Sequence, residues 1–68
     1  MVVVEVANAN GTQQEIRIMW EGRTYSHGLT GENGRVTFDA NPGSGKIYLN
    51  GQKVHEGRIS RLTRVRRD

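Results

Sequence analysis

Residues 46–54 read KIYLNGQKV and carry the clearest fold signal in the chain. Apolar and polar side chains alternate on both sides of Asn50-Gly51. Both turn residues tolerate positive φ, so the segment predicts a β-hairpin with a two-residue turn. The same dipeptide recurs at residues 10–11 and 33–34, each time between apolar stretches. The repetition predicts a meander of short antiparallel strands.

Side-chain parity predicts the register of each hairpin, because successive strand residues face opposite sides of a sheet. For the first turn we favour a three-residue loop at 10–12 over a two-residue loop. The longer loop gathers the aliphatic side chains on one face and sets Glu5 opposite Arg17 on the other. The predicted pairs are Val6–Ile16, Val4–Ile18, Val2–Trp20 and Val3–Met19 in the first hairpin, Ile18–Tyr25 and Trp20–Arg23 in the second, Leu29–Phe38 in the third, and Ile47–Val54 and Tyr48–Lys53 in the fourth.

These alternations predict an all-β fold, a compact sandwich or partly open barrel of about six to seven short strands. Residues 40–45, with the only proline, predict a connection between sheets rather than a tight hairpin. The predicted core consists of Val4, Val6, Ile16, Ile18, Trp20, Leu29, Val36, Phe38, Ile47, Leu49 and Val54.

The composition agrees with strands and limits the class of protein. The 68 residues include nine glycines and no cysteine, and Val, Ile and Thr far outnumber Ala and Leu. The length argues against a large enclosed substrate cavity. Without cysteine the chain has no disulfide framework, thiolate nucleophile or Cys-based zinc site. No apolar run is long enough to span a membrane, and the first residues lack the basic start of a signal peptide. The compartment stays open.

The positive charge is concentrated at the C-terminal end. The net charge is +3, yet residues 58–68 alone contain five arginines against one aspartate. We therefore divide the chain into a single β domain, 1–57, and a basic C-terminal strand or tail, 58–68. For 59–65 a strand is favoured over a helix. It would place Ile59, Arg61, Thr63 and Val65 on one side and Leu62 on the other.

The chain contains fragments of catalytic and binding motifs but no complete one. Residues 43–46, GSGK, lack the first glycine and the hydroxyl of a phosphate-binding loop, and a predicted strand follows them. His27 and His55 have no metal-ligand spacing, and His27 is expected on the core side or rim. Ser26 and His27 are adjacent in a strand, so their side chains point to opposite faces. We predict no catalytic residues, no metal and no cofactor.

Residues 29–38, LTGENGRVTF, followed by Asn41-Pro42-Gly43 and residues 46–49, KIYL, resemble the carboxypeptidase regulatory-like and Cna-B-like domains. Those prealbumin-type sandwiches carry a similar Asn-Gly hairpin, a Pro-Gly loop and an alternating strand. The resemblance covers residues 29–49. It implies a non-catalytic accessory, stalk or adhesion module and supplies no catalytic residues.

Two functions remain open. The first is a non-enzymatic binding or structural module that meets a protein partner through an edge strand or an exposed face, with self-association as one form and Val3 and Met19 as an exposed apolar pair. The second is electrostatic binding of nucleic acid. Its candidate residues are Arg58, Arg61, Arg64, Arg66, Arg67, Lys53 and Tyr48.

Overall fold

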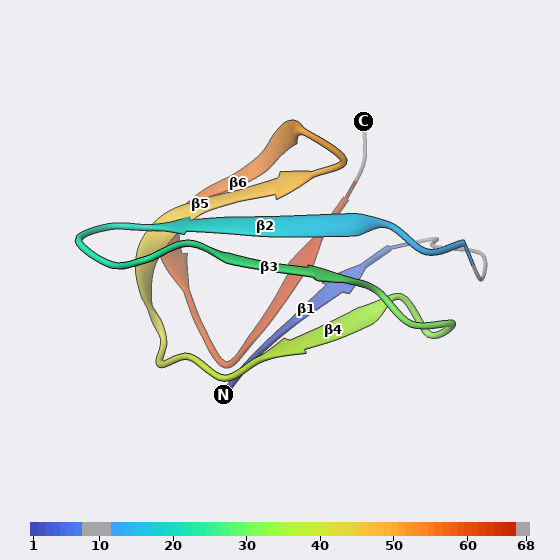
Figure 1. Ribbon diagram of the computed structural model, residues 1–68, viewed down its shortest axis with the longest axis horizontal. Helices are drawn as coiled ribbons and strands as arrows, with labels where there is room; N and C mark the ends of the chain where they lie inside the picture. Colours follow the sequence, from blue (N-terminus) through green and yellow to red (C-terminus); the bar gives the residue numbers. More distant parts are fainter. Residues whose placement is uncertain (8–11, 67–68) are drawn as a thin grey trace.

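The chain folds into two packed β-sheets, as the computed structural model in Figure 1 shows. The structure describes residues 1–7 and 12–66. Every regular element in this part is a strand, so the all-β prediction is confirmed. The strands are β1 (Val2–Val6), β2 (Glu15–Trp20), β3 (Ser26–Leu29), β4 (Arg35–Phe38), β5 (Gly43–Leu49), β6 (Gln52–Ile59) and β7 (Leu62–Val65).

The two sheets form a sandwich that does not close into a barrel. Sheet A has the order β4-β1-β7, and sheet B has the order β3-β2-β5-β6. All pairs are antiparallel except β1 and β7, which run parallel. The connection after β4 carries the chain from sheet A to sheet B, as predicted from residues 40–45, although β5 already begins at Gly43.

The predicted pairing of β1 with β2 is wrong. β1 lies between β4 and β7, with Val4 opposite Val36 and Thr63, and Glu5 opposite Arg35 and Arg64 rather than Arg17. The aliphatic side chains of β1 and β2 belong to opposite sheets and meet in the same core. An alternating sequence predicts that one face of the strand is buried. It does not tell whether the next apolar strand lies beside it in the same sheet or packs against it from the opposite sheet. The proposed loop at 10–12 falls mostly outside the described residues.

The second and third turns reverse the chain, but the strands that follow them do not pair as predicted. β3 pairs with β2 one residue later than expected, so that Ile18 faces Ser26 instead of Tyr25. Trp20 Nε1 donates to Ser26 Oγ at 2.9 Å, and this bond fits the longer turn. After residues 31–34 the chain leaves sheet B for sheet A, so β3 and β4 do not form the predicted Leu29–Phe38 hairpin.

The fourth turn is the predicted hairpin with one irregularity. Tyr48 faces Lys53 as expected, and Asn50 and Gly51 have φ of 50° and 88°. Val54 is an extra residue in β6, so Ile47 faces His55 instead of Val54. On the neighbouring strand β5, a Cβ at Gly45 would lie 2.6 Å from the carbonyl oxygen of Met19, which explains the glycine there.

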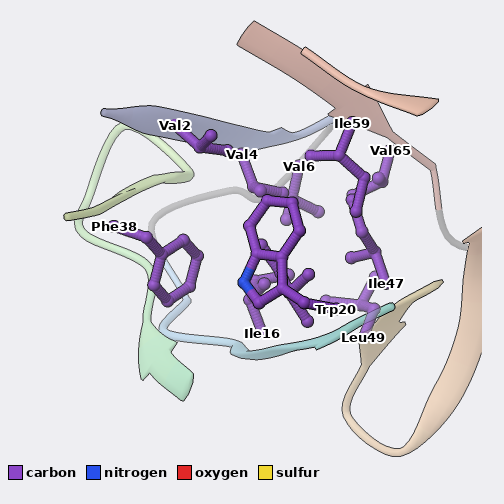
Figure 2. Close-up of a cluster of buried hydrophobic side chains, with 11 residues drawn as sticks. Val2, Val4, Val6, Ile16, Trp20, Phe38, Ile47, Leu49, Ile59 and Val65 are labelled. Atoms are coloured by element: carbon purple, nitrogen blue, oxygen red, sulfur yellow. The ribbon is translucent and has the colours of Figure 1, made fainter. Parts of the chain in front are cut away.

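The core lies between the sheets around Trp20, as Figure 2 shows. It contains Val2, Val4, Val6, Ile16, Ile18, Trp20, Phe38, Ile47, Leu49, Ile59 and Val65. Val36 and Val54 pack against it and are partly buried. Leu29 does not belong to it, because the shifted β3 register turns this side chain outward, where it is 56% exposed.

Residues 59–65 are extended but do not form one strand. β6 ends at Ile59 in sheet B, and β7 begins at Leu62 in sheet A. Ile59, Thr63 and Val65 are buried and Leu62 is exposed, as the strand parity predicted. Arg61, predicted on the buried side, is exposed because the chain turns between the two sheets there. Ser60 holds the corner, since its hydroxyl donates to the carbonyl oxygen of Leu62 at 2.9 Å.

Candidate functional site

The serine and histidines considered as catalytic candidates form structural hydrogen bonds or an ion pair. Ser26 accepts the Trp20 indole N–H, whereas His27 lies on the outer face, 3.0 Å from a carboxylate oxygen of Glu15. The expectation of a core or rim position for His27 is wrong, again because of the one-residue shift. His55 Nε2 donates to the carbonyl oxygen of Arg58 at 2.9 Å, since a carbonyl only accepts. Within the described residues, no group of three metal-ligating side chains comes together.

Val3 and Met19 do not form the exposed apolar pair predicted from the first hairpin. Val3 lies on the outer face of sheet A beside Thr37 and Leu62, and it is partly buried. Met19 lies on the outer face of sheet B opposite Lys46 and is 45% exposed. The two side chains therefore occupy opposite surfaces of the sandwich.

The predicted nucleic-acid residues are divided between the two sheets. Tyr48 and Lys53 face each other on the outer face of sheet B, with Arg58 farther along β6. Arg64 belongs to the outer face of sheet A, while Arg61 and Arg66 flank β7 and are exposed. Arg67 lies outside the described residues.

A row of polar and aromatic side chains crosses the outer face of sheet B. His27, Arg17, Tyr48 and Lys53 stand opposite one another on β3, β2, β5 and β6, and we call them the cross-strand row. The guanidinium of Arg17 also lies 5.6 Å from the ring centre of Tyr25, within reach of a cation–π interaction. Sequence reasoning missed Arg17 because the wrong first hairpin assigned it to Glu5.

Two of the charges in this face neutralise each other locally. Lys53 Nζ lies 2.7 Å from a carboxylate oxygen of Glu56. The hydrogen bond from Lys53 lowers the pKa of Glu56 below its ordinary value, and Glu56 raises the pKa of Lys53. Lys46 lies opposite Glu56 and lowers its pKa further, so the open positive charge of the face comes from Arg17 and Arg58 more than from the two lysines.

On the outer face of sheet A, one carboxylate lies between two arginines. Arg35 Nε donates to Glu5 at 2.8 Å and Arg64 Nε donates to the other oxygen at 2.7 Å. The hydrogen bond from Arg35 is the main cause that lowers the pKa of Glu5, and Arg64 lowers it further. This Arg–Glu–Arg group joins all three strands of the sheet and keeps one positive charge in excess.

The side of β7 that faces away from β1, which we call the β7 edge, has no neighbouring strand in the described part of the chain, although the Leu62 carbonyl oxygen there already accepts the Ser60 hydroxyl. Val3 N–H donates to Arg61 O at 2.7 Å and Ala7 N–H donates to Val65 O at 2.9 Å. In a parallel pair, alternate residues use their N–H and C=O toward the partner. The backbone groups of Leu62 and Arg64 therefore point away from β1. Such an edge is a template for another strand.

The surface next to the β7 edge is incompletely covered. Sheet B has four strands and sheet A three, and β3 adjoins β4, the first strand of sheet A. At the opposite side β6 forms the border of sheet B and adjoins β7, the last strand of sheet A. The bulge turns both Val54 and His55 toward the inside, yet each is only partly buried. These two residues leave part of the inner side of β6 open, on the border of the sheet that has one strand more.

No protein-family model, no curated protein and no solved structure matches this chain. No helix in the described part of the chain is long and apolar enough to cross a membrane.

Proposed function

We propose that this chain is a non-enzymatic protein-binding module that takes an extended segment of a partner as an additional strand beside β7. The observation that carries the proposal is the unequal strand number of the two sheets. An added strand would meet the N–H groups of Leu62 and Arg64 and the carbonyl oxygen of Arg64 at the β7 edge, and it would cover Val54 and His55. Main-chain hydrogen bonds supply affinity in this mode of recognition, and side-chain contacts supply selectivity.

The resemblance to carboxypeptidase regulatory-like and Cna-B-like domains supports the same role. A two-sheet sandwich is the architecture that the resemblance implies, and residues 29–49 run from the end of β3 through β4 to the end of β5. We propose that the chain shares the accessory, non-catalytic character of those domains. The engagement of both histidines in local hydrogen bonds favours this over an acid–base role.

Strand addition is testable by selecting binders from a library of random peptides displayed on phage and mapping them by amide hydrogen exchange. We expect the bound peptides to protect the amides of Leu62 and Arg64. The Leu62→Pro variant removes one donor from the β7 edge and should weaken binding. Thr37→Pro is the matched control, because Val6–Gly34 pairing directs the backbone of Thr37 away from β1 on the other edge of sheet A.

Selected peptides that protect only amides near Arg17 and Tyr48 would contradict strand addition, and so would equal effects of the two proline substitutions. Sedimentation of the free protein separates self-association from capture of a different chain.

The cross-strand row favours nucleic-acid binding as a second candidate. Tyr48 lies between Arg17 and Lys53 and offers a ring on which a base can stack. Proteins that bind single-stranded nucleic acids combine aromatic and basic side chains in this way. This candidate ranks lower because the arginines of residues 58–66 are divided between two surfaces. It predicts that Arg17→Ala and Tyr48→Ala weaken binding of oligo-dT at low salt, and no binding of oligo-dT would contradict it.

A further inference from the structure

The chemistry of the partner strand follows from the side chains around the β7 edge. We infer that the segment added beside β7 alternates acidic and apolar residues. Its acidic side chains would lie on the outer face of sheet A, and its apolar side chains would lie over β6. The inference rests on the proposed function and adds the sequence pattern of the ligand.

The acidic half of the pattern follows from charge. Residues 58–66 contain four arginines and no acidic residue. Within the described residues, the carboxylate that forms a salt bridge with one of these arginines is that of Glu5, which Arg64 shares with Arg35. Arg61 and Arg66 are exposed, and neither forms a salt bridge within the described chain. Opposite charges on neighbouring strands stabilise a sheet, so acidic residues are favoured opposite Arg64.

The apolar half follows from parity. Leu62 and Arg64 point outward on β7, whereas Thr63 and Val65 point inward. An added strand has the same alternation, so every second side chain faces the interior. These inward-facing side chains would contact Val54 and His55, which are both partly buried. Apolar residues at these positions would complete the burial.

Two other occupants fit the edge less well. A second copy that offered its own β7 would set arginine against arginine, and like charges on neighbouring strands are destabilising. A nucleic-acid phosphate chain accepts hydrogen bonds but donates none, so it would leave the carbonyl oxygen of Arg64 without a partner. An acidic segment of another protein satisfies both the charge and the backbone.

Three synthetic peptides of about eight residues, the usual strand length, test the pattern: alternating Val–Glu, alternating Val–Lys and alternating Ser–Glu. Their affinities for the full chain are measured by fluorescence anisotropy at low and at high salt. We expect the Val–Glu peptide to bind about tenfold more tightly than each of the others, from several pair energies of modest size. Added salt should reduce its advantage over the Val–Lys peptide.

A matched pair of charge reversals locates the effect. Arg64 and Arg35 bind the two oxygens of the same Glu5 carboxylate, but only Arg64 lies at the β7 edge. Arg64→Glu should remove the preference for Val–Glu over Val–Lys, whereas Arg35→Glu should leave it unchanged. If the Arg64→Glu chain fails to fold, the peptide comparison on the natural chain still decides.

The outcomes separate the pattern from the function. Equal affinity of all three peptides, with the amides of Leu62 and Arg64 protected, overturns the pattern and leaves strand addition standing. Equal effects of the two charge reversals overturn the placement at β7. If none of the peptides protects these amides from exchange, both the pattern and strand addition are overturned. Both are also overturned if oligo-dT protects these amides more strongly than the peptides do.

Discussion

The turns at Asn33-Gly34 and Asn50-Gly51 have the same dipeptide but lead the chain to different sheets. After Asn50-Gly51 the chain returns beside β5 and stays in sheet B, with Tyr48 opposite Lys53. After Asn33-Gly34 it leaves sheet B and enters sheet A, where β4 pairs with β1. The dipeptide marks where the backbone reverses, because Gly34 and Gly51 both have positive φ. Which sheet receives the next strand is decided by longer-range packing.

The same contrast separates the two sheets. Sheet B contains two pairs of consecutive strands, β2–β3 and β5–β6. Sheet A contains none, since β1 pairs only with β4 and β7. Sheet A therefore depends on contacts between residues far apart in the sequence, and its loss should cost more than a defect in any one turn.

The largest expected effect comes from deleting residues 60–68, which removes β7. The deletion exposes one edge of β1 and uncovers Val4, Val6 and Ile59. Burial of one such side chain contributes about 1.5–3 kcal/mol. A chain of this length has a total stability of roughly 3–10 kcal/mol, so the shortened chain should not fold. Circular dichroism with a urea titration measures this. A cooperative transition at the original midpoint would show that β7 contributes little.

A smaller loss of stability is expected when either turn asparagine is replaced by alanine, and the loss should differ between the two turns. Asn50 has positive φ, its Oδ1 accepts the Glu15 N–H at 2.9 Å and its Nδ2 donates to the buried Gln14 at 3.1 Å. The Asn33 side chain forms one hydrogen bond within the described residues, from the Arg35 N–H at 3.1 Å. Asn50→Ala should therefore cost about 2–4 kcal/mol and Asn33→Ala about 0.5–1.5 kcal/mol in the free energy of unfolding.

Asn50→Gly is the control for this comparison, because glycine keeps the backbone conformation and removes only the side-chain bonds. Its cost should lie between those of the two alanine variants. Equal costs at positions 33 and 50 in urea titrations would contradict the distinction between the turns.

The smallest expected effect concerns acid stability in sheet A. The pKa of Glu5 is lowered in the folded state, chiefly by the hydrogen bond from Arg35. The group therefore stabilises the fold above its ordinary pKa, and this contribution is lost as the pH falls through the lowered folded value. Glu5→Gln should flatten the acid side of the stability curve. Glu32→Gln, at an exposed turn residue, is the control. An unchanged curve for Glu5→Gln would show that the Arg–Glu–Arg group is too solvated to matter.

The sequence predicted the fold class and most of the core because alternation is a local property. Ile16, Ile18 and Trp20 are buried as predicted, and β5–β6 has the predicted turn. The pairing of β1 could not be predicted, since Val2, Val4 and Val6 satisfy parity equally well beside β2 or across from it. Leu29 was misplaced by a single extra residue in the second turn. Such errors arise because a shift of one residue exchanges the two faces of a strand.

Of the candidate site, the sequence predicted the outward-facing Tyr48–Lys53 pair and the basic residues around β7. It did not predict the β7 edge itself, because an edge is a property of the whole sheet order. The bulge at Val54, which opens the inner side of β6, also left no signal in the pattern of residues 46–54.

The position of β1 has a consequence for biosynthesis. This strand leaves the ribosome before the other six strands of the sandwich, but Val3 meets Leu62 only when β7 has been made. Until then the valine-rich β1 has one unpaired edge and exposed apolar side chains, and incompletely folded chains in this state are prone to aggregate. Glu5 is the only charge within that run. The carboxylate that later holds two arginines is thus also placed to act as a gatekeeper against premature association of newly made chains.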